Sequence, residues 1–352
     1  MTRSGLPVLS FLMVNYAPQW EAASRTIVGL KDALAGDFDA RVLGFNTRGT
    51  LLRRDGPRSR YLPAPVLLAP RRVVRALIGD ADIFHVFASG GERFLLPKVA
   101  GPRSVLSVAK GGSRLGRLER NIPNLRRFRY VIVESRRERD LLGQFGLDAG
   151  QVCLVYPGAH LRPYVPPPDG TPFTMAFATA PLSSGQLLSR GVHLMVRAAA
   201  LLPEVRFIFA WRGADYRALL RLIADAGVTN IDVRNGLLDM EAIYASAHAV
   251  ILPGLAHDSL KPCPQSLVES LAHGKPVLVT TPTHVSDVIA ESGAGIVFEP
   301  RVPDLCAAII ELRDRYADIQ SRCHATAAST FSPEVFLAKH RRLYADVCGT
   351  AG

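Results

Sequence analysis

Apolar runs rich in β-branched residues alternate with helical patterns along the whole of the 352-residue chain. The runs lie at 8–14, 40–45, 82–88, 104–109, 130–135 and 152–158 in the first half, and at 173–180, 205–211, 230–236, 249–254, 275–280 and 295–300 in the second. Because parallel strands need a crossover connection, which is usually a helix, this alternation is typical of parallel sheets. The sequence therefore predicts an α/β protein.

Residues 162–172 interrupt the alternation. Their sequence, RPYVPPPDGTP, clusters prolines with a glycine and has no apolar periodicity, which is typical of a linker. The break predicts two doubly wound Rossmann-like domains facing a central cleft, one of residues 1–165 and one of residues 171–332. Ligands of such sheets bind beyond the carboxyl ends of the strands, so the cleft is the expected site.

The composition narrows the class of protein. Hydrophobic residues make up 48% of the chain, which predicts a globular protein. The 5 cysteines are widely spread, which favours reduced thiols in a cytoplasmic protein and argues against a zinc site. The segment GLPVLSFLMVNYA (5–17) lacks a convincing cleavage site, so we interpret it as a buried first strand rather than a secretion signal. No apolar run is long enough to cross a bilayer.

The positive charge is unevenly distributed. The net charge of the chain is +11, with +13 in residues 1–165 and −2 in the remainder. The excess is concentrated at 48–60, 71–75 and 114–129. Two interpretations stay open, a solvated basic surface or a face that meets phosphate on anionic lipid or an acidic acceptor. Nucleic acid is not an expected partner, because no recognised binding module accompanies the charge.

Residues 261–279, KPCPQSLVESLAHGKPVLV, contain one acidic side chain, Glu269. The segment predicts an irregular approach, a short helix that Gly274 and Pro276 end, and a strand. Glu269 lies about one turn into the helix, away from its apolar face. Taken alone, it is either a surface residue or a ligand-binding one.

Several segments together resemble the retaining glycosyltransferases of family 4, which have the two-domain GT-B fold. They are YVIVESRRERDLL (130–142), VCLVYPGAHL (152–161), SRGVHLMVRAAALLPEVRFIFAWRG (189–213), NGLLDMEAIYASAHAVILPG (235–254) and the segment 261–279. They follow the order and spacing of the family. The resemblance implies a hexosyltransferase-type enzyme that moves a sugar from a nucleoside diphosphate sugar to an acceptor hydroxyl.

The last of these segments falls on the Glu-x7-Glu motif of the family, with Glu269 as the second glutamate. In the family this glutamate accepts hydrogen bonds from the ribose hydroxyls, a role that suits an acceptor-only group able to hold two vicinal hydroxyls. At the place of the first glutamate this chain has Lys261. A cation there implies a different sugar contact or a phosphate contact, unless the lysine only extends into solvent.

The resemblance also implies a set of groups for the donor diphosphate. Arg190 matches the lysine of the Lys-Gly pair of the family and can bind phosphate through two nitrogen atoms. We expect Arg190, Lys261 and the backbone N–H groups near Gln265 and Ser266 to hold the leaving diphosphate. The donor domain has no Asp-x-Asp motif, so we expect no metal site, the two cations taking the place of a metal ion.

Four further residues complete the donor site that the resemblance implies. Gly191 follows Arg190, Arg212 follows a predicted strand, and the base is expected against the backbone near Gly236 and Leu237. No cofactor is expected besides the nucleotide-sugar substrate.

The first domain departs further from the family. NYAPQWEAASR (15–25) replaces a glycine-rich loop, and Ala109 or Lys110 replaces a histidine beside the reacting centre. Lys110 precedes two glycines at the carboxyl end of a predicted strand, so it is the expected catalytic residue of this domain, with a solvent-facing lysine as the alternative. His85 is flanked by apolar residues and is expected to be a core histidine.

The terminal segment 333–352 resembles the last helix of the family, which packs back on the first domain; a surface amphipathic helix is the alternative. The activity predicted from the resemblance is retaining and metal-independent. Two alternatives stay open: an inactive nucleotide-sugar or glycan-binding protein, and a GT-B nucleotide-sugar 2-epimerase. The expected partners are the donor and an acceptor glycan, lipid or small metabolite, with peripheral contact to an anionic inner membrane face as a further hypothesis.

Overall fold

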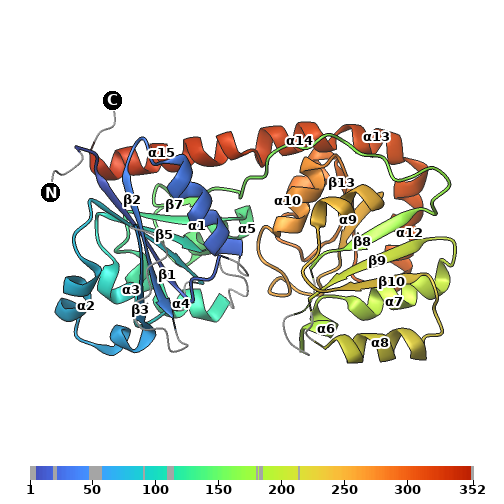
Figure 1. Ribbon diagram of the computed structural model, residues 1–352, viewed down its shortest axis with the longest axis horizontal. Helices are drawn as coiled ribbons and strands as arrows, with labels where there is room; N and C mark the ends of the chain where they lie inside the picture. The colour runs from blue at the N-terminus through green and yellow to red at the C-terminus, as the bar shows by residue number, and fades with distance from the viewer. Residues whose placement is uncertain are drawn as a thin grey trace. The chain divides into compact units, whose positions relative to one another are not determined.

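The chain divides into two compact units. The computed structural model describes residues 5–18, 22–46, 58–89, 92–108, 115–179, 181, 185–212 and 215–349, with backbone alone for residues 22 and 115–117. Unit 1 contains residues 1–156 and 336–352, and unit 2 contains residues 157–335 (Figure 1).

Unit 1 is built on a parallel sheet with the strand order β3-β2-β1-β4-β5-β6-β7. Its described strands are β1 (Val8–Val14), β2 (Asp39–Asn46), β3 (Ser59–Pro63), β4 (Ile83–Ala88), β5 (Ser104–Val108), β6 (Tyr130–Val133) and β7 (Val152–Leu154). The chain moves outward from β1 to β3 and then continues from β4 on the other side of β1. This reversal defines a doubly wound sheet.

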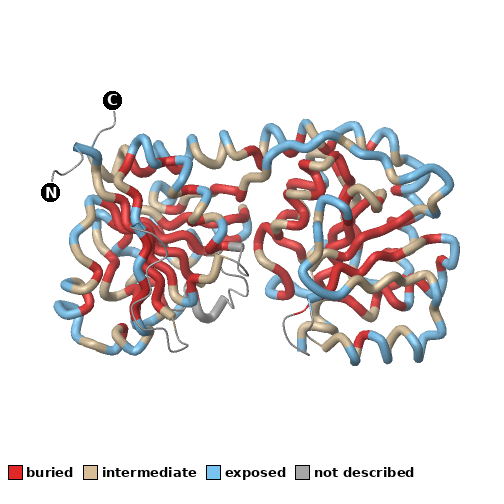
Figure 2. Tube along the Cα trace, viewed as in Figure 1, coloured by how far each residue is buried: buried red, intermediate tan, exposed pale blue. Residues whose placement is uncertain are grey.

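Helices cover both faces of this sheet. They are α1 (Ala22–Ala33), the 3₁₀ helix η1 (Ala64–Leu68), α2 (Arg71–Ile78), α3 (Leu96–Val99), α4 (Leu115–Leu125), α5 (Arg136–Gln144) and α15 (Pro333–Cys348). Successive strand residues point to opposite faces, so Leu12 joins a core with α2 to α5 while Phe11 and Met13 join a core with α1 and α15. The strands are accordingly buried along most of their length (Figure 2).

The edge strand β3 was not predicted from the sequence. It begins at the end of the basic segment 48–60, of which residues 48–57 are outside the described residues, and continues to Pro63. Among the described strands only β2 pairs with it, and its last residue is Pro63. Edge strands tolerate proline and charge, so their apolar pattern is weak.

Unit 2 repeats the design with the strand order β10-β9-β8-β11-β12-β13. Its described strands are β8 (Thr174–Phe177), β9 (Arg206–Trp211), β10 (Ile231–Asn235), β11 (Ala249–Leu252), β12 (Val277–Thr280) and β13 (Gly295–Phe298). Each of the predicted runs of both halves contains a strand, all pairs are parallel, and both sheets are doubly wound. The predicted fold class of two doubly wound Rossmann-like domains is therefore confirmed.

The helices of unit 2 divide between the faces of its sheet. They are α6 (Gly185–Ser189), α7 (Val192–Leu201), α8 (Tyr216–Asp225), α9 (Met240–Ser246), α10 (Gln265–Ala272), α11 (Ser286–Ser292), α12 (Val302–Asp314), α13 (Tyr316–Ser321) and α14 (Cys323–Thr330). One core joins α7, α8 and α12 to the strands through residues such as Phe177, Trp211 and Leu278. Figure 1 shows α9 and α10 on the opposite side of the sheet from α7 and α8.

The proline-rich segment at the start of unit 2 is bound to that unit. The backbone N–H of Arg162 donates to the carbonyl of Ala272 over 2.9 Å, and Lys275 Nζ donates to the carbonyl of Val165 over 2.6 Å. Lys275 is buried and also lies 4.7 Å from the centre of the Tyr164 ring. Residues 162–172 are thus a docked strap instead of the free linker that their composition suggests.

Helix α15 is tied to unit 1 by a buried cluster of polar rings. His85 lies in β4, as the core histidine that was predicted, and its ring nitrogens contact Tyr344 Oη at 2.5 Å and Ser107 Oγ at 2.7 Å. His340 lies 5.7 Å from His85 between ring centres, and its Nδ1 contacts the carbonyl of Phe336 at 2.9 Å. Burial lowers the pKa of His340 to about 4, and burial also holds the pKa of His85 well below its ordinary value.

These histidines should make unit 1 sensitive to acid. The unfolded chain protonates a histidine near pH 6.5, whereas folded His340 takes up its proton only near pH 4. Stability that is fully present above pH 6.5 is therefore lost as the pH falls toward 4, by about 3 kcal/mol for this one group. We expect His340→Phe, which keeps a ring in the core, to lose less free energy of unfolding between pH 7 and pH 4.5 than the parent chain does.

Urea denaturation at the two pH values measures the difference. His160→Phe, at an exposed histidine, serves as the control and should retain the parent pH dependence. Equal losses in H340F and the parent chain would show that His340 does not contribute.

Candidate functional site

In the unit 2 sheet, β8 and β11 lie side by side, and the chain leaves them in opposite directions. From β8 the chain proceeds to β9 and β10 on one side, and from β11 to β12 and β13 on the other. The loops that follow these two strands diverge, which leaves room beyond their carboxyl ends, the place where doubly wound sheets bind ligands. Two groups of predicted donor residues follow these strands: Arg190 and Gly191 come after β8, and the segment from Lys261 to Glu269 comes after β11.

Gly191 lies at the centre of this edge. It precedes α7 with φ of 69° and faces the residue after β11: a Cβ atom on Gly191 would lie 2.1 Å from the carbonyl oxygen of Pro253. Only glycine fits both the left-handed backbone and this approach. The start of α7 is thereby fixed against the end of β11.

Arg190 is held over the end of β8. Its Nη1 donates to the carbonyl oxygen of Thr179 over 2.7 Å. Burial lowers the pKa of Arg190 from its ordinary value, although a guanidinium keeps its charge at neutral pH. The same loop carries Thr179 Oγ1, a buried hydroxyl with no hydrogen-bond partner among the described residues. The end of β8 thus presents a partly desolvated cation and a hydroxyl.

Helix α10 begins without a side-chain cap. Its N-cap is Pro264, which has no side-chain oxygen to accept from the first-turn N–H groups. Gln265 opens the helix and Ser266 follows, only 8% exposed, with an Oγ that has no hydrogen-bond partner within the described part of the chain. Lys261 is half-buried in the loop just before the helix. Uncapped N–H groups, a hydroxyl and a nearby cation form a typical anion-binding arrangement.

Glu269 lies one turn into α10. It is partly exposed, whereas the residues on either side of it are buried. Its Oε2 accepts a hydrogen bond from Tyr244 Oη over 2.9 Å. Tyr244, on α9, was not singled out from the sequence. A contact between two residues 25 positions apart has no signature in a single sequence.

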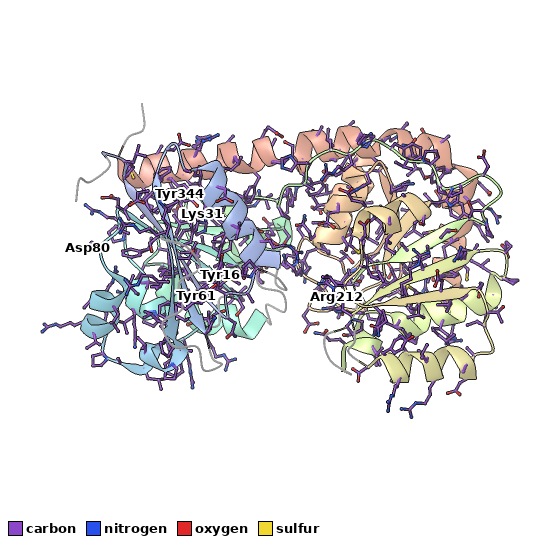
Figure 3. All side chains as sticks on the ribbon, in the orientation of Figure 1. Tyr16, Lys31, Tyr61, Asp80, Arg212 and Tyr344 are labelled. Atoms are coloured by element: carbon purple, nitrogen blue, oxygen red, sulfur yellow. The ribbon has the colours of Figure 1, made fainter. Side chains whose placement is uncertain are left out.

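Arg212, Gly236 and Leu237 follow the neighbouring strands β9 and β10. The backbone N–H of Gly236, with φ of 139°, donates to the carbonyl of Trp211 over 3.0 Å. Arg212 is exposed where β9 ends (Figure 3), and its charge acts on Tyr244. Leu237 is 81% exposed, the highest value among the large apolar side chains described. An apolar surface therefore lies at the predicted base position.

Lys110, together with Ala109 and the glycines that follow, lies outside the described residues. Lys110 stays a prediction.

Acidic groups do not gather into a metal site in the described part of the chain. No cluster of three or more histidine, cysteine, aspartate or glutamate side chains is present there. Unit 1 has two Asp-x-Asp spacings. At 37–39, Asp37 pairs with Arg341 at 2.9 Å and Asp39 with Arg41 at 2.5 Å, and at 80–82 the Asp82 carboxylate accepts from the backbone N–H of Val8 over 2.8 Å. None of the helices described combines the length and apolar character required to cross a membrane.

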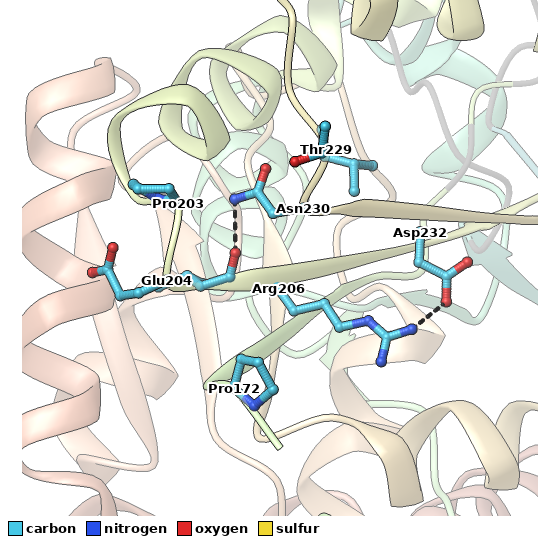
Figure 4. A pocket seen from close by; sticks show the side chains of 9 residues that line it. Pro172, Pro203, Glu204, Arg206, Thr229, Asn230 and Asp232 are labelled. Carbon is cyan, nitrogen blue, oxygen red and sulfur yellow. Dashed lines mark hydrogen bonds and ion pairs between the residues drawn. The ribbon is translucent and has the colours of Figure 1, made fainter. Parts of the chain in front are cut away.

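A hollow of about 260 Å³ opens at the opposite edge of the unit 2 sheet, where β9 and β10 begin (Figure 4). Polar groups in its wall are already paired: Arg206 with Asp232 at 2.9 Å, and Asn230 Nδ2 with the carbonyl of Val205 at 2.8 Å. It faces the amino ends of the strands and lies away from every predicted donor residue. We do not assign it to the donor site.

Many classes of protein bind ligands at the carboxyl ends of a doubly wound sheet, and the sequence of unit 2 distinguishes among them. Residues 182–315 match the family of Glycosyl transferases group 1. The match lies within unit 2 and covers less than half of the chain. The matched segment includes Arg190, Arg212, Lys261 and Glu269, and it confirms the predicted enzyme class, a glycosyltransferase. No curated protein matches the chain by sequence.

Solved structures resemble the chain over nearly its whole length. A sucrose-phosphate synthase from Thermosynechococcus elongatus has 16% identity and a TM-score of 0.79, covering 98% of this chain and 100% of its own. HepE from Anabaena, in complex with UDP, has 17% identity and a TM-score of 0.77 over 96% and 100%. WaaG, a glycosyltransferase involved in lipopolysaccharide biosynthesis, has 14% identity and a TM-score of 0.66 over 98% and 100%. At these identities the likeness concerns the fold, which is GT-B.

Unit 2 should not tolerate a side chain at Gly191. We expect Gly191→Ala to destabilise unit 2 by about 2–4 kcal/mol, because the new Cβ combines left-handed strain with a clash against Pro253. Gly227→Ala is the matched control: φ is 63° there, and no atom lies within 4 Å of the added Cβ. It should cost only about 1 kcal/mol. Calorimetric melting of both variants measures the difference, and equal costs would contradict the close approach.

Proposed function

We propose that the chain is a retaining, metal-independent glycosyltransferase of family 4 that moves a hexose from a nucleoside diphosphate sugar to an acceptor hydroxyl. The observation that carries the proposal is the Glu269 carboxylate one turn behind the uncapped start of α10, with the half-buried Lys261 in the loop that precedes this helix. This arrangement suits a ligand that has both vicinal hydroxyls and a diphosphate. The match to group 1 glycosyltransferases and the complexes of HepE with UDP and UDP-glucose support the choice of donor.

The diphosphate is held by positive charge and by N–H groups. Arg190 binds one phosphate from the end of β8, Lys261 binds from the loop before α10, and the first turn of α10 contributes Gln265 N, Ser266 N and Ser266 Oγ. Charge on the leaving diphosphate grows as its bond to the sugar breaks, so these groups stabilise the transition state more than the bound donor. Two cations neutralise this charge without a metal ion.

Transfer exchanges one bond of the anomeric carbon for another. The bond between that carbon and the phosphate oxygen breaks, and the bond to the acceptor oxygen forms on the same face of the sugar. The acceptor proton passes to the departing phosphate oxygen, so no protein base is required. The resemblance gives Lys110 the role of a further cation, which stays a prediction.

The nucleoside lies across the ends of β9 and β10. The ribose hydroxyls bind Glu269, and the base packs against the backbone of Gly236 and the exposed side chain of Leu237. Arg212 lies at the same edge, within the electrostatic range of Tyr244. Contacts of this kind leave the choice of base open to experiment.

Removal of the Glu269 carboxylate tests the donor site. Glu269→Ala should weaken binding of the cognate nucleoside diphosphate by about 1.5–3 kcal/mol, because the ribose loses a charged acceptor. Calorimetry with UDP, GDP, ADP and CDP measures this. Glu311→Ala, which removes an exposed glutamate from α12, is the control and should bind as the parent chain does. Unchanged affinity in E269A would refute the assignment.

Release of nucleoside diphosphate from the matching sugar nucleotides, assayed in excess EDTA, distinguishes the activities. Release with transfer or hydrolysis supports a metal-independent transferase. Binding without release indicates a nucleotide-sugar binding protein, and an altered sugar still attached to the nucleotide indicates an epimerase. Turnover that appears only with added Mg²⁺ or Mn²⁺ contradicts the role given to Arg190 and Lys261.

Unit 1 binds the acceptor, and the proposal includes contact between this unit and an anionic membrane. The support is a basic surface at the start of α2, where Arg71 and Arg72 are exposed beside two exposed apolar side chains, Leu68 at 67% and Val73 at 46%. Burial lowers the pKa of Arg75, and the charges of the neighbouring Arg71 and Arg127 lower it further. Apolar side chains among arginines suit the boundary between lipid headgroups and acyl chains.

Flotation with anionic vesicles tests this contact. The chain should bind vesicles at low salt and release most of them at physiological salt, since each basic residue contributes about 1 kcal/mol before screening. Charge reversal in Arg71→Glu/Arg72→Glu should abolish binding. The control variant Arg217→Glu/Arg221→Glu makes the same change in net charge on α8 of unit 2, where both arginines are exposed, and it should bind vesicles as the parent chain does. Absence of binding at low salt would favour a soluble acceptor.

A further inference from the structure

Tyr244 makes a buried contact with the side chain assigned to the ribose. Its hydroxyl donates to Glu269 Oε2 over 2.9 Å, and the tyrosine is only 1% exposed. Burial, followed by the charge of Glu269, raises the pKa of Tyr244 well above its ordinary value. The hydroxyl therefore keeps its proton at every pH at which the protein is used and acts as a fixed donor.

The tyrosine ring is itself held in place. It packs against His273 with 4.7 Å between ring centres, and His273 Nδ1 contacts the backbone carbonyl oxygen of Glu269 at 2.7 Å. Tyr244 thus contacts the carboxylate while its stacking partner contacts the backbone of the same residue. Few rotamers of Tyr244 keep both its stacking on His273 and its hydrogen bond to Glu269. The Glu269 side chain therefore has a defined direction.

One hydrogen bond leaves most of the carboxylate available. Among the described residues, Tyr244 is the one hydrogen-bond donor to the Glu269 carboxylate, and it occupies one lone pair of Oε2. A carboxylate has about four acceptor positions. Two vicinal hydroxyls need two of them in one fixed plane, and rotation of the terminal carboxylate is otherwise easy.

We propose that Tyr244 is a positioning residue that orients Glu269 toward both ribose hydroxyls and thereby sets the preference for ribonucleotides over 2′-deoxyribonucleotides. The inference rests on the proposed nucleotide donor. Tyr244 itself does not touch the ligand. Without its hydroxyl the carboxylate retains its charge and still meets one hydroxyl at a time, but the paired contact is weakened.

Binding of ribonucleoside and 2′-deoxyribonucleoside diphosphates tests the orientation. The probes are UDP, GDP, ADP and CDP with their 2′-deoxy counterparts, measured by calorimetry. Tyr244→Phe should weaken the best-bound ribonucleotide by about five- to tenfold, the scale of one hydrogen bond to a charged group, and should change the 2′-deoxy analogue less than twofold. The ratio between the two affinities should fall accordingly.

Two variants separate orientation from general loss of stability. Tyr316→Phe removes another tyrosine hydroxyl of unit 2, one that donates to the carbonyl of His248 over 3.1 Å, and should leave the ratio unchanged. Glu269→Asp keeps the charge but withdraws it from Tyr244, so it should lower the ratio as Y244F does. In an E269A background, Y244F should have no further effect on the ratio.

The outcomes are distinct. If the parent chain binds none of the ribonucleotides, the proposed function fails. If the parent chain binds and prefers a ribonucleotide while Y244F retains that preference, the role of Tyr244 alone is refuted. A reduced ratio in Y316F as well would assign the effect to stability and would also refute it.

Discussion

The contact of Gly191 with the carbonyl oxygen of Pro253 connects the two halves of the unit 2 sheet. It joins the start of the helix after β8 to the residue after β11, the two strands between which the chain reverses direction. Arg190 precedes this contact, and α10 follows the loop that leaves Pro253. The start of α7, and with it the backbone of Arg190, is therefore fixed against the end of β11 by close backbone packing.

Much of the fold could be predicted because buried parallel strands leave a strong pattern. Strands such as β1 and β9 are apolar nearly throughout, since both faces are covered by helices. The edge strand β3 carries no such pattern and was missed. The strap at 162–172 has the composition of a linker, and its hydrogen bonds to Ala272 and Lys275 depend on a fold that composition cannot reveal.

Some residues of the candidate site could likewise be predicted from the sequence, and others could not. Glu269, Arg190 and Lys261 could be named because they fall at motif positions of a family whose spacing this chain follows. Tyr244 could not, because nothing in its own segment points to a residue on another helix. Residues that support a ligand contact from behind are fixed by tertiary packing, so a single sequence identifies the ligand contacts more readily than their supports.

The strap has a practical consequence for anyone who wishes to express the donor unit by itself. Its composition invites a cut within the prolines, yet Arg162 and Val165 bond to the two residues that flank the turn after α10, Ala272 and Lys275. A fragment that began after the strap would leave Lys275 without its acceptor and without the Tyr164 ring. The boundary that preserves the support of the Glu269 helix lies before Pro157, among residues that a reader of the sequence would assign to the other domain.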